Sequence, residues 1–219
     1  VVGCVNLGWP VFNVEKSLEE ILNLPVKVAN DANIAALGEM FKGGGNGYEN
    51  MIMVTLGTGV GGGVIINGQI LAGNNGAGGE IGHITVNPHE KESCNCGRKG
   101  CLEQYTSATG IVKIAKEILV KEDYDSNLRN IENITAKDIF DLAKNNDKLA
   151  LKIVEKFSNI LGRALANISI ICNPEVFVIG GGVSKAGDIL LEGIKKSYRE
   201  NAFHATVDTK FEISILGND

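Results

Sequence analysis

Residues 78–103, GGEIGHITVNPHEKESCNCGRKGCLE, concentrate side chains that bind metals in one loop-rich segment. These side chains belong to His83, Cys94, Cys96 and Cys101. Three thiols and an imidazole form a ligand set that tetrahedral Zn²⁺ prefers. Gly97 and Gly100 would let the chain fold back around one ion, because glycine reaches the backbone angles of sharp turns without strain. The segment therefore predicts a zinc site of the Cys₃His type.

Two other interpretations of the cysteines stay open. Cys94 and Cys96 could form a disulfide in an oxidising compartment, although cysteines two residues apart rarely reach disulfide geometry. The thiols could also be free and buried. The spacing differs from the CxxC pairs of common zinc fingers, which counts against that class of module but not against a metal.

Two carboxylates flank the metal-binding side chains. Glu80 precedes His83 by three residues, and Glu103 follows Cys101 by two. Folding the segment around an ion would bring both carboxylates near the ligands. A purely structural zinc does not require them.

A third carboxylate, Asp31, lies in the run Asn30-Asp31-Ala32-Asn33. A short apolar strand is expected at 26–29, and a helix from this run to the glycines at 43–45. Asp31 would then sit at a strand-to-helix junction, where open α/β sheets place their ligands. The alternative is that Asp31 only caps the helix.

Glycines follow a predicted strand at 51–56 and would turn the chain at 57–63 into a second strand at 64–67. Asn67-Gly68 is a hairpin signal leading to a further short strand. The uncovered N–H groups of Gly57 and Gly59, with the Thr58 hydroxyl, could bind a phosphate. The run is not a Walker loop, and a tight hairpin without a ligand is the alternative.

Besides the helix after Asp31, capping residues and apolar spacing predict four helices in the first 172 residues. Their expected bounds are 14–22 after Asn13, 107–121 from Ser107, 135–145 from Thr135 and 147–172 from Asp147. The last is apolar along one face and wholly apolar at its end, which predicts a buried helix.

A second glycine run, Gly180-Gly181-Gly182, follows a predicted buried strand at 175–179. We expect Ser184 to cap a helix at 185–200, and a last strand at 211–216. Glycines before a helix N-terminus permit close approach of a nucleotide, and a helix-packing turn is the alternative.

Composition narrows the class of protein. The chain has 219 residues, 44% of them hydrophobic, which suits one large α/β domain or two small ones. A net charge of −5 argues against a nucleic-acid-binding surface. There is no apolar run of membrane-spanning length and no signal peptide, so a cytoplasmic protein is expected, with Cys4 and Cys172 as buried free thiols.

Taken together, these motifs resemble those of the ROK family of sugar kinases, especially its bacterial glucokinases. GGEIGH followed by CNCGRKGCLE carries the likeness, and NDAN, TLGTGVGGG and VIGGGVS occur in the family's order. The resemblance covers nearly the whole chain. It implies an α/β fold of the actin-like, ribonuclease H-like type with a zinc-bound loop.

The resemblance also implies roles for individual residues. Asp31 would be the general base that takes the proton of a sugar 6-hydroxyl as it attacks the γ-phosphate of ATP. The implied sugar contacts are Asn30, Asp31, Glu80, His83 and Glu103. The implied ligands of a structural Zn²⁺ are His83, Cys94, Cys96 and Cys101, with the second ring nitrogen of His83 on a sugar hydroxyl. The implied nucleotide contacts are Gly57, Thr58, Gly59, Gly180, Gly181 and Gly182, with Mg²⁺ accompanying ATP.

The chain departs from the family's pattern in one respect. The family's Asp-x-Gly-Gly-Thr segment, which contacts phosphate and magnesium, does not occur in this sequence. We therefore expect a fragment, with the end of a small lobe and the hinge in residues 1–30 and the large lobe in residues 31–219. Alone it is expected to bind zinc but not to transfer phosphate. Relatives are commonly dimers, so a homodimer is expected.

Hexose phosphorylation, with glucose first, is the leading functional prediction. Mannose, fructose, N-acetylglucosamine and N-acetylmannosamine present similar hydroxyls and stay open as substrates. A sugar-responsive repressor of the same family is the alternative, although Asp31 favours an enzyme. A zinc-stabilised module without a small ligand would leave Asn30, Asp31, Glu80 and Glu103 unexplained.

Overall fold

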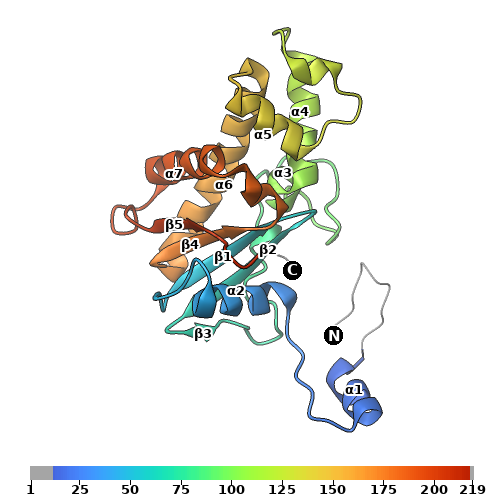
Figure 1. The fold of residues 1–219 in the computed structure, drawn as a ribbon, viewed down its shortest axis with the longest axis vertical. Coiled ribbons are helices and arrows are strands. Elements are labelled where there is room, and N and C mark those ends of the chain that lie inside the picture. Colours follow the sequence, from blue (N-terminus) through green and yellow to red (C-terminus); the bar gives the residue numbers. More distant parts are fainter. Residues whose placement is uncertain (1–11, 218–219) are drawn as a thin grey trace. The chain divides into compact units, whose positions relative to one another are not determined.

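The computed structural model describes residues 12–217 (Figure 1). The chain divides into two units, Val1–Asp31 and Ala32–Asp219. In the first unit, helix α1 (Val14–Leu22) begins where the sequence predicts, because the Asn13 side chain accepts the Lys16 N–H. The strand predicted at 26–29 is wrong. The Val26 N–H donates to a carboxylate oxygen of Glu19 instead of to a neighbouring strand.

A five-stranded sheet lies at the centre of the second unit, with the order β3-β2-β1-β4-β5. The strands are β1 (Met51–Leu56), β2 (Val60–Ile66), β3 (Gln69–Ile70), β4 (Val176–Gly180) and β5 (Lys210–Ile213). Antiparallel pairing joins β1, β2 and β3, whereas β4 and β5 run parallel to β1. The carboxyl ends of β1, β4 and β5 therefore meet at one edge, at which the two glycine runs begin.

Helix α2 (Asp31–Lys42) covers one face of the sheet from Ala32 onward (Figure 1). Ala36 packs there with the buried side chains of Met51, Met53, Ile65, Val176 and Val178. A Cβ added at Gly63 would lie 2.4 Å from the Cβ of Ala36. The glycines in this part of β2 thus admit a closely packed helix. The turn predicted over 57–63 is shorter, since β2 begins at Val60.

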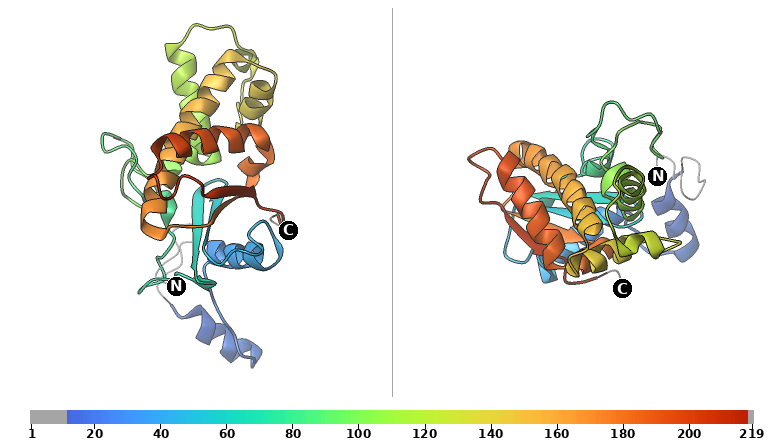
Figure 2. Two further views of the ribbon diagram at one scale, coloured as in Figure 1. Left: turned by 90° about the vertical axis from the view of Figure 1, so that its left-hand side faces the viewer. Right: turned by 90° about the horizontal axis from the view of Figure 1, so that it is seen from above.

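The helices that follow the metal-binding segment lie on the opposite side of the sheet (Figures 1 and 2). They are α3 (Glu103–Thr106), α4 (Ala108–Lys121), α5 (Ala136–Lys144), α6 (Lys148–Cys172) and α7 (Asp188–Asn201). Helices α6 and α7 lie side by side across the sheet (Figure 2). Short 3₁₀ turns occur at η2 (Ile81–His83), η3 (Asn127–Asn130) and η4 (Gly182–Ala186).

Side-chain caps confirm three of the predicted helix starts in this layer. Ser107 accepts the Gly110 N–H, Asp147 accepts the Ala150 N–H, and Thr135 forms a capping box with Asp138. The expected cap at Ser184 is wrong. Its hydroxyl donates to the Gly181 carbonyl inside η4, and α7 begins only at Asp188.

The carboxyl end of α6 differs from the buried helix that the sequence predicts. Ile168 is 8% exposed, but Ile170 and Ile171 are 59% and 85% exposed, because an end that is apolar all round also has apolar residues on its outward face. Cys172 is half-buried rather than buried, and Cys4 lies outside the described residues. In the described part of the chain, no helix has the length and apolar character needed to span a membrane.

Candidate active site and metal centre

Backbone hydrogen bonds between its two ends hold residues 83–103, here called the metal loop. The Val86 N–H donates to the Gly100 carbonyl at 2.8 Å, and the Leu102 N–H donates to the Ile84 carbonyl at 2.9 Å. Gly100 has a φ of 72°, and a Cβ at this position would lie 1.8 Å from the Asn87 carbonyl oxygen. A residue with a side chain would collide there, so glycine is required where the two ends of the metal loop pair.

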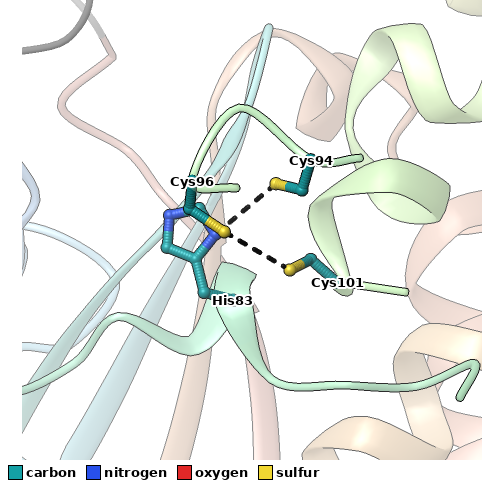
Figure 3. A group of neighbouring side chains, drawn as sticks. All are labelled: His83, Cys94, Cys96 and Cys101. Carbon is teal, nitrogen blue, oxygen red and sulfur yellow. Dashed lines mark hydrogen bonds between the residues drawn. The ribbon is translucent and has the colours of Figure 1, made fainter. Parts of the chain in front are cut away.

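The metal loop brings its four predicted ligands together (Figure 3). Their ligand atoms all lie within 4.8 Å of one another. The Cys94 Sγ is 3.8 Å from the His83 Nδ1, and the Cys96 Sγ is 3.7 Å from the Cys101 Sγ. A tetrahedral zinc with Zn–S bonds of 2.3 Å requires sulfur atoms about 3.8 Å apart. The four side chains therefore fit Zn²⁺, and none of the four described cysteines is in a disulfide.

A metal at this position would have to displace thiol protons. Burial, together with the neighbouring thiols and Glu103, raises the pKa of Cys94 to about 12. A thiol in that state gives up its proton when a cation takes its place, which is how structural zinc sites form. The Nδ1 of His83 faces Cys94, which leaves Nε2 as the nitrogen for a second ligand.

Glu103 connects the metal loop to the turn between β1 and β2. Its Oε1 accepts from the Cys94 thiol at 3.5 Å, and its Oε2 accepts the Val60 N–H at 3.1 Å. A Cβ at Gly59 would lie 2.2 Å from that Oε2, so a larger residue would displace the carboxylate. The Ala108 N–H also donates to the Gly57 carbonyl. The metal loop and the glycine turn are thus parts of one site.

A pocket of about 540 Å³ opens on the other side of this turn. Gly57 and Thr58 line it together with Gly182, so the structure brings the two glycine runs to a common cavity. The first residue of α4, the first part of α5 with its cap, and the η4 turn supply the remaining lining residues: Ala108, Thr135, Ala136, Lys137, Phe140, Asp141, Val183, Lys185 and Ala186. Apolar walls with a few charged groups and a helix N-terminus suit a nucleotide.

The sequence did not indicate the residues that α5 contributes to this pocket. The capping box at Thr135 predicts where α5 begins, but it carries no information about what the helix start faces. Only the packing of α5 beside η4 places Lys137 and Asp141 next to the glycine turns.

Three of the glycines predicted to touch the nucleotide do not line the pocket. Gly59 lies against Glu103, and Gly180 ends β4 beside Met53 and Ser214. Gly181 has a φ of 82°, and a Cβ there would lie 2.5 Å from the Leu56 carbonyl oxygen. Close packing accounts for each of these three positions, against side chains at Gly59 and Gly180 and against the backbone at Gly181.

The remaining predicted sugar contacts lie at two places in the chain. Glu80 is exposed and directly precedes η2, whose last residue is His83. Asn30 and Asp31 lie at the start of α2, where Asp31 is the first helical residue rather than the residue before it.

A polar network anchors the outer part of the metal loop to α3 and α4. The Tyr105 hydroxyl donates to a carboxylate oxygen of Glu90 at 2.5 Å, and it accepts from the Asn87 amide at 2.8 Å. The Lys113 ammonium donates to Glu90 at 3.0 Å and to Glu92 at 2.7 Å. Bonds from Tyr105, the Glu92 backbone and Lys113 lower the pKa of Glu90 to about 2.

This network predicts acid sensitivity. A carboxylate with a lowered pKa stabilises the fold above its unfolded pKa, and this stabilisation disappears as the pH falls to the folded value. For Glu90 the window runs from pH 4.5 down to about 2. Glu90→Gln should lower the free energy of unfolding at pH 7 by roughly 1–2 kcal/mol. The loss is no larger because Lys113 contacts solvent, which screens its ion pair with Glu90.

Urea unfolding between pH 7 and pH 3 measures this effect. The difference between the wild-type protein and Glu90→Gln should shrink as the pH falls. Glu92→Gln is the matched control, because Glu92 bonds the same lysine but its side chain is 72% exposed. A constant difference over this pH range, or an equal effect of the two variants, would contradict the assignment.

Comparison with known proteins identifies the family. The sequence model of the ROK family matches residues 1–218. The chain belongs to the ROK family. It is 52% identical to a glucokinase of Halalkalibacterium halodurans over 223 aligned residues, which cover 98% of this chain and 66% of that protein.

The solved structures of ROK proteins confirm the actin-like α/β fold. The crystal structure of a ROK family glucokinase from Streptomyces griseus, in complex with glucose and AMPPNP, matches with a TM-score of 0.85 at 33% identity. The match covers 99% of this chain and 72% of that one.

Other ROK relatives are regulators. A xylose repressor of Caldicellulosiruptor bescii is 31% identical over 96% of this chain and 53% of its own length. The chain spans from about half to about two thirds of the lengths of the curated relatives that it matches.

Proposed function

We propose that the protein is an ATP-dependent hexose kinase that phosphorylates the 6-hydroxyl, with glucose as the leading substrate. The bond from the Val60 N–H to Glu103, which joins the last residue of the metal loop to the glycine turn, carries this proposal. It joins a cluster of polar side chains suited to sugar hydroxyls to a turn that opens on a nucleotide-sized pocket. The glucokinase relatives support the same activity.

Each predicted residue has a chemical task in this reaction. Asp31 accepts the proton of the attacking hydroxyl, which is the usual task of an aspartate in kinases. Asn30, Glu80, His83 and Glu103 hold the other sugar hydroxyls. Because phosphoryl transfer needs positioning and charge neutralisation more than covalent chemistry, these contacts orient the hydroxyl toward the γ-phosphate.

The nucleotide would occupy the pocket between the glycine turn and η4. Thr58 would meet the phosphates through its N–H and hydroxyl, because the Gly57 N–H donates to the Gly59 carbonyl, and Gly57 and Gly182 also line the pocket. Mg²⁺ accompanies ATP and neutralises charge on its phosphates. Zn²⁺ on the metal loop would be structural, since four protein ligands leave no open position, and it would fix the ring of His83.

A substrate panel on the full-length protein tests the activity. Glucose, mannose, fructose, N-acetylglucosamine and N-acetylmannosamine are each offered with ATP and Mg²⁺, and ADP release is measured with a coupled assay. We expect glucose to give the highest kcat/KM. Sugar binding without phosphorylation of any of these sugars would favour the repressor function, which the xylose repressor relative supports.

Two adjacent glycines provide a prediction about the nucleotide pocket. A Cβ at Gly182 meets no atom within 4 Å, so Gly182→Leu should fold normally while its side chain occupies the pocket. We expect the KM for ATP to rise at least tenfold, with the Tm within a few degrees of the wild-type value, because a side chain in the pocket excludes ligand volume.

Gly181→Ala is the matched comparison for this prediction. Its φ of 82° and its closeness to the Leu56 carbonyl should lower the Tm without a specific change in the KM for ATP. Unchanged ATP kinetics in Gly182→Leu would place the nucleotide elsewhere.

We also propose the lobe division expected from the family, with the end of the small lobe and the hinge in residues 1–30 and the large lobe in residues 31–219. A homodimer and a cytoplasmic location are further proposals that the family resemblance supports.

A further inference from the structure

Glu39, on α2, is the only acidic or basic side chain that is buried among the described residues. It is 1% exposed, and no lysine or arginine of the described chain pairs with it. Glu39 also lies in the last turn of α2, where the helix dipole disfavours a negative charge. A buried carboxylate in such a position is costly unless hydrogen bonds compensate it.

Four donors from two other segments surround this carboxylate. The Gly44 N–H donates to Oε2 at 2.7 Å, and the Ser214 hydroxyl donates to Oε1 at 2.6 Å. The N–H groups of Ile215 and Leu216 donate at 3.1 and 2.9 Å. Burial acts to raise the pKa of Glu39, but the bonds from Ser214, Leu216, Gly44 and Ile215 outweigh it and lower the pKa.

These bonds fasten α2 to the edge of the sheet at which the glycine runs begin. The Ser214 N–H donates to the Ile179 carbonyl at 2.9 Å, and the next residue, Gly180, pairs with Thr55 of β1. The chain of contacts therefore runs from Glu39 through Ser214 to the ends of β4 and β1. β1 leads directly into Gly57, and β4 leads through Gly181 into Gly182; both Gly57 and Gly182 line the nucleotide pocket.

The apolar contacts of α2 restrain its position along the sheet less well than the hydrogen bonds of Glu39 do. Nearest β2, Ala32 and Ala36 face Gly61 and Gly63, and such small side chains provide few ridges against sliding or rotation, while the larger Leu37 and Met40 are only partly buried against the same cluster. Directional bonds at Glu39 supply that restraint. Because Asp31 begins the same helix eight residues earlier, roughly 12 Å along its axis, the restraint is transmitted to Asp31.

We propose that Glu39 is a positioning residue, which fixes the axial position and rotation of α2 and thereby aims Asp31 at the hydroxyl that it deprotonates. The inference rests on the proposed kinase function. It assigns Glu39 no contact with substrate and no proton transfer.

Glu39→Gln tests this role, because it keeps the shape of the side chain but turns an amide N–H₂ group toward N–H donors. We expect kcat to fall about 10- to 100-fold, as small misplacements of reacting groups do, with the KM values for glucose and ATP within about threefold. Hydrogen exchange of the backbone amides of α2 should become faster. Ser214→Ala removes one of the four donors and should lower kcat by a smaller factor.

Tyr198→Phe is the control for a purely structural effect. The Tyr198 hydroxyl is buried and donates to the Thr206 carbonyl at 2.6 Å, on the opposite face of the sheet. Its loss should lower the Tm while leaving kcat within twofold. If Glu39→Gln and Ser214→Ala lower only the Tm in the same way, or raise the KM values alone, the proposal is wrong.

Failure of the kinase function itself gives a different pattern. In that case the wild-type protein phosphorylates no sugar of the panel, and hydrogen exchange alone decides whether Glu39 restrains α2. Unchanged exchange across α2 in Glu39→Gln would overturn the positioning role as well.

Discussion

Asp31→Asn in the full-length protein is expected to lower kcat for glucose phosphorylation by about 10²- to 10⁴-fold, the range that general bases contribute. The asparagine side chain has nearly the same shape but does not accept the proton of the hydroxyl. The KM for glucose should change little, because the amide still hydrogen-bonds a hydroxyl group. The folded state should be nearly unaffected, since loss of an acidic group from a first helical turn costs about 0.3–1 kcal/mol.

A coupled ADP-release assay and a thermal melt together check this prediction. Asp123→Asn serves as the matched control, because it makes the same chemical change at an exposed position in the loop after α4. The control should retain wild-type kcat. If Asp31→Asn keeps more than about a tenth of the activity, the group that takes the proton is not Asp31.

Local sequence signals predicted most of the elements that form the site. Asn13, Ser107, Thr135 and Asp147 define helix starts because a cap is a contact between residues two or three apart. The strand at Met51–Leu56 was predictable from its unbroken apolar run. The four metal ligands were recognisable because three of them lie within eight residues of one another.

The parts that were missed depend on contacts between segments far apart in the chain. Glu39 and its donors at 214–216 are about 175 positions apart, and nothing near either end indicates the other. The role of α5 in the pocket depends in the same way on its packing beside η4. The strand predicted at 26–29 is a different kind of miss, since no strand forms there and the Val26 N–H donates to the nearby Glu19 side chain.

Glycine runs illustrate the same limit within one motif. From the sequence, Gly57 to Gly63 looked like one turn, although the structure gives these glycines different tasks. Gly57 lines the pocket, Gly59 makes room for Glu103, and Gly63 admits Ala36 of α2. A glycine is recognisable in a sequence, but the atom that would collide with its missing side chain is not.

Removal of the metal is expected to weaken sugar binding more than it weakens the fold. Within the metal loop, the buried side chains are those of Cys94, Cys101 and Leu102, so the loop has little apolar core of its own. Without an ion, the order of the loop depends on the backbone hydrogen bonds between its two ends and on the Glu90 network. The rest of the large unit keeps its sheet and helices, because the core on both faces of the sheet lies outside the loop.

Cys96→Ser is the variant of choice for this prediction. Cys96 is the exposed member of the ligand set, so its replacement leaves no cavity in the core. We expect the KM for glucose to rise at least tenfold and the KM for ATP to change less. The Tm should fall by roughly 5–10 °C, which for a unit of this size corresponds to a loss of about 2–3 kcal/mol.

Metal analysis and a matched cysteine variant complete the test. The wild-type protein should contain about one zinc per chain, as structural sites of this affinity do, and Cys96→Ser or prolonged chelation should remove it. Cys172→Ser removes a half-buried thiol at the end of α6 and should leave zinc content and sugar kinetics unchanged. Since His83 is both a predicted metal ligand and a predicted sugar contact, loss of zinc should free its ring to rotate. A zinc-free protein that binds glucose with wild-type affinity would therefore show that the loop does not need the metal to present His83 and Glu103.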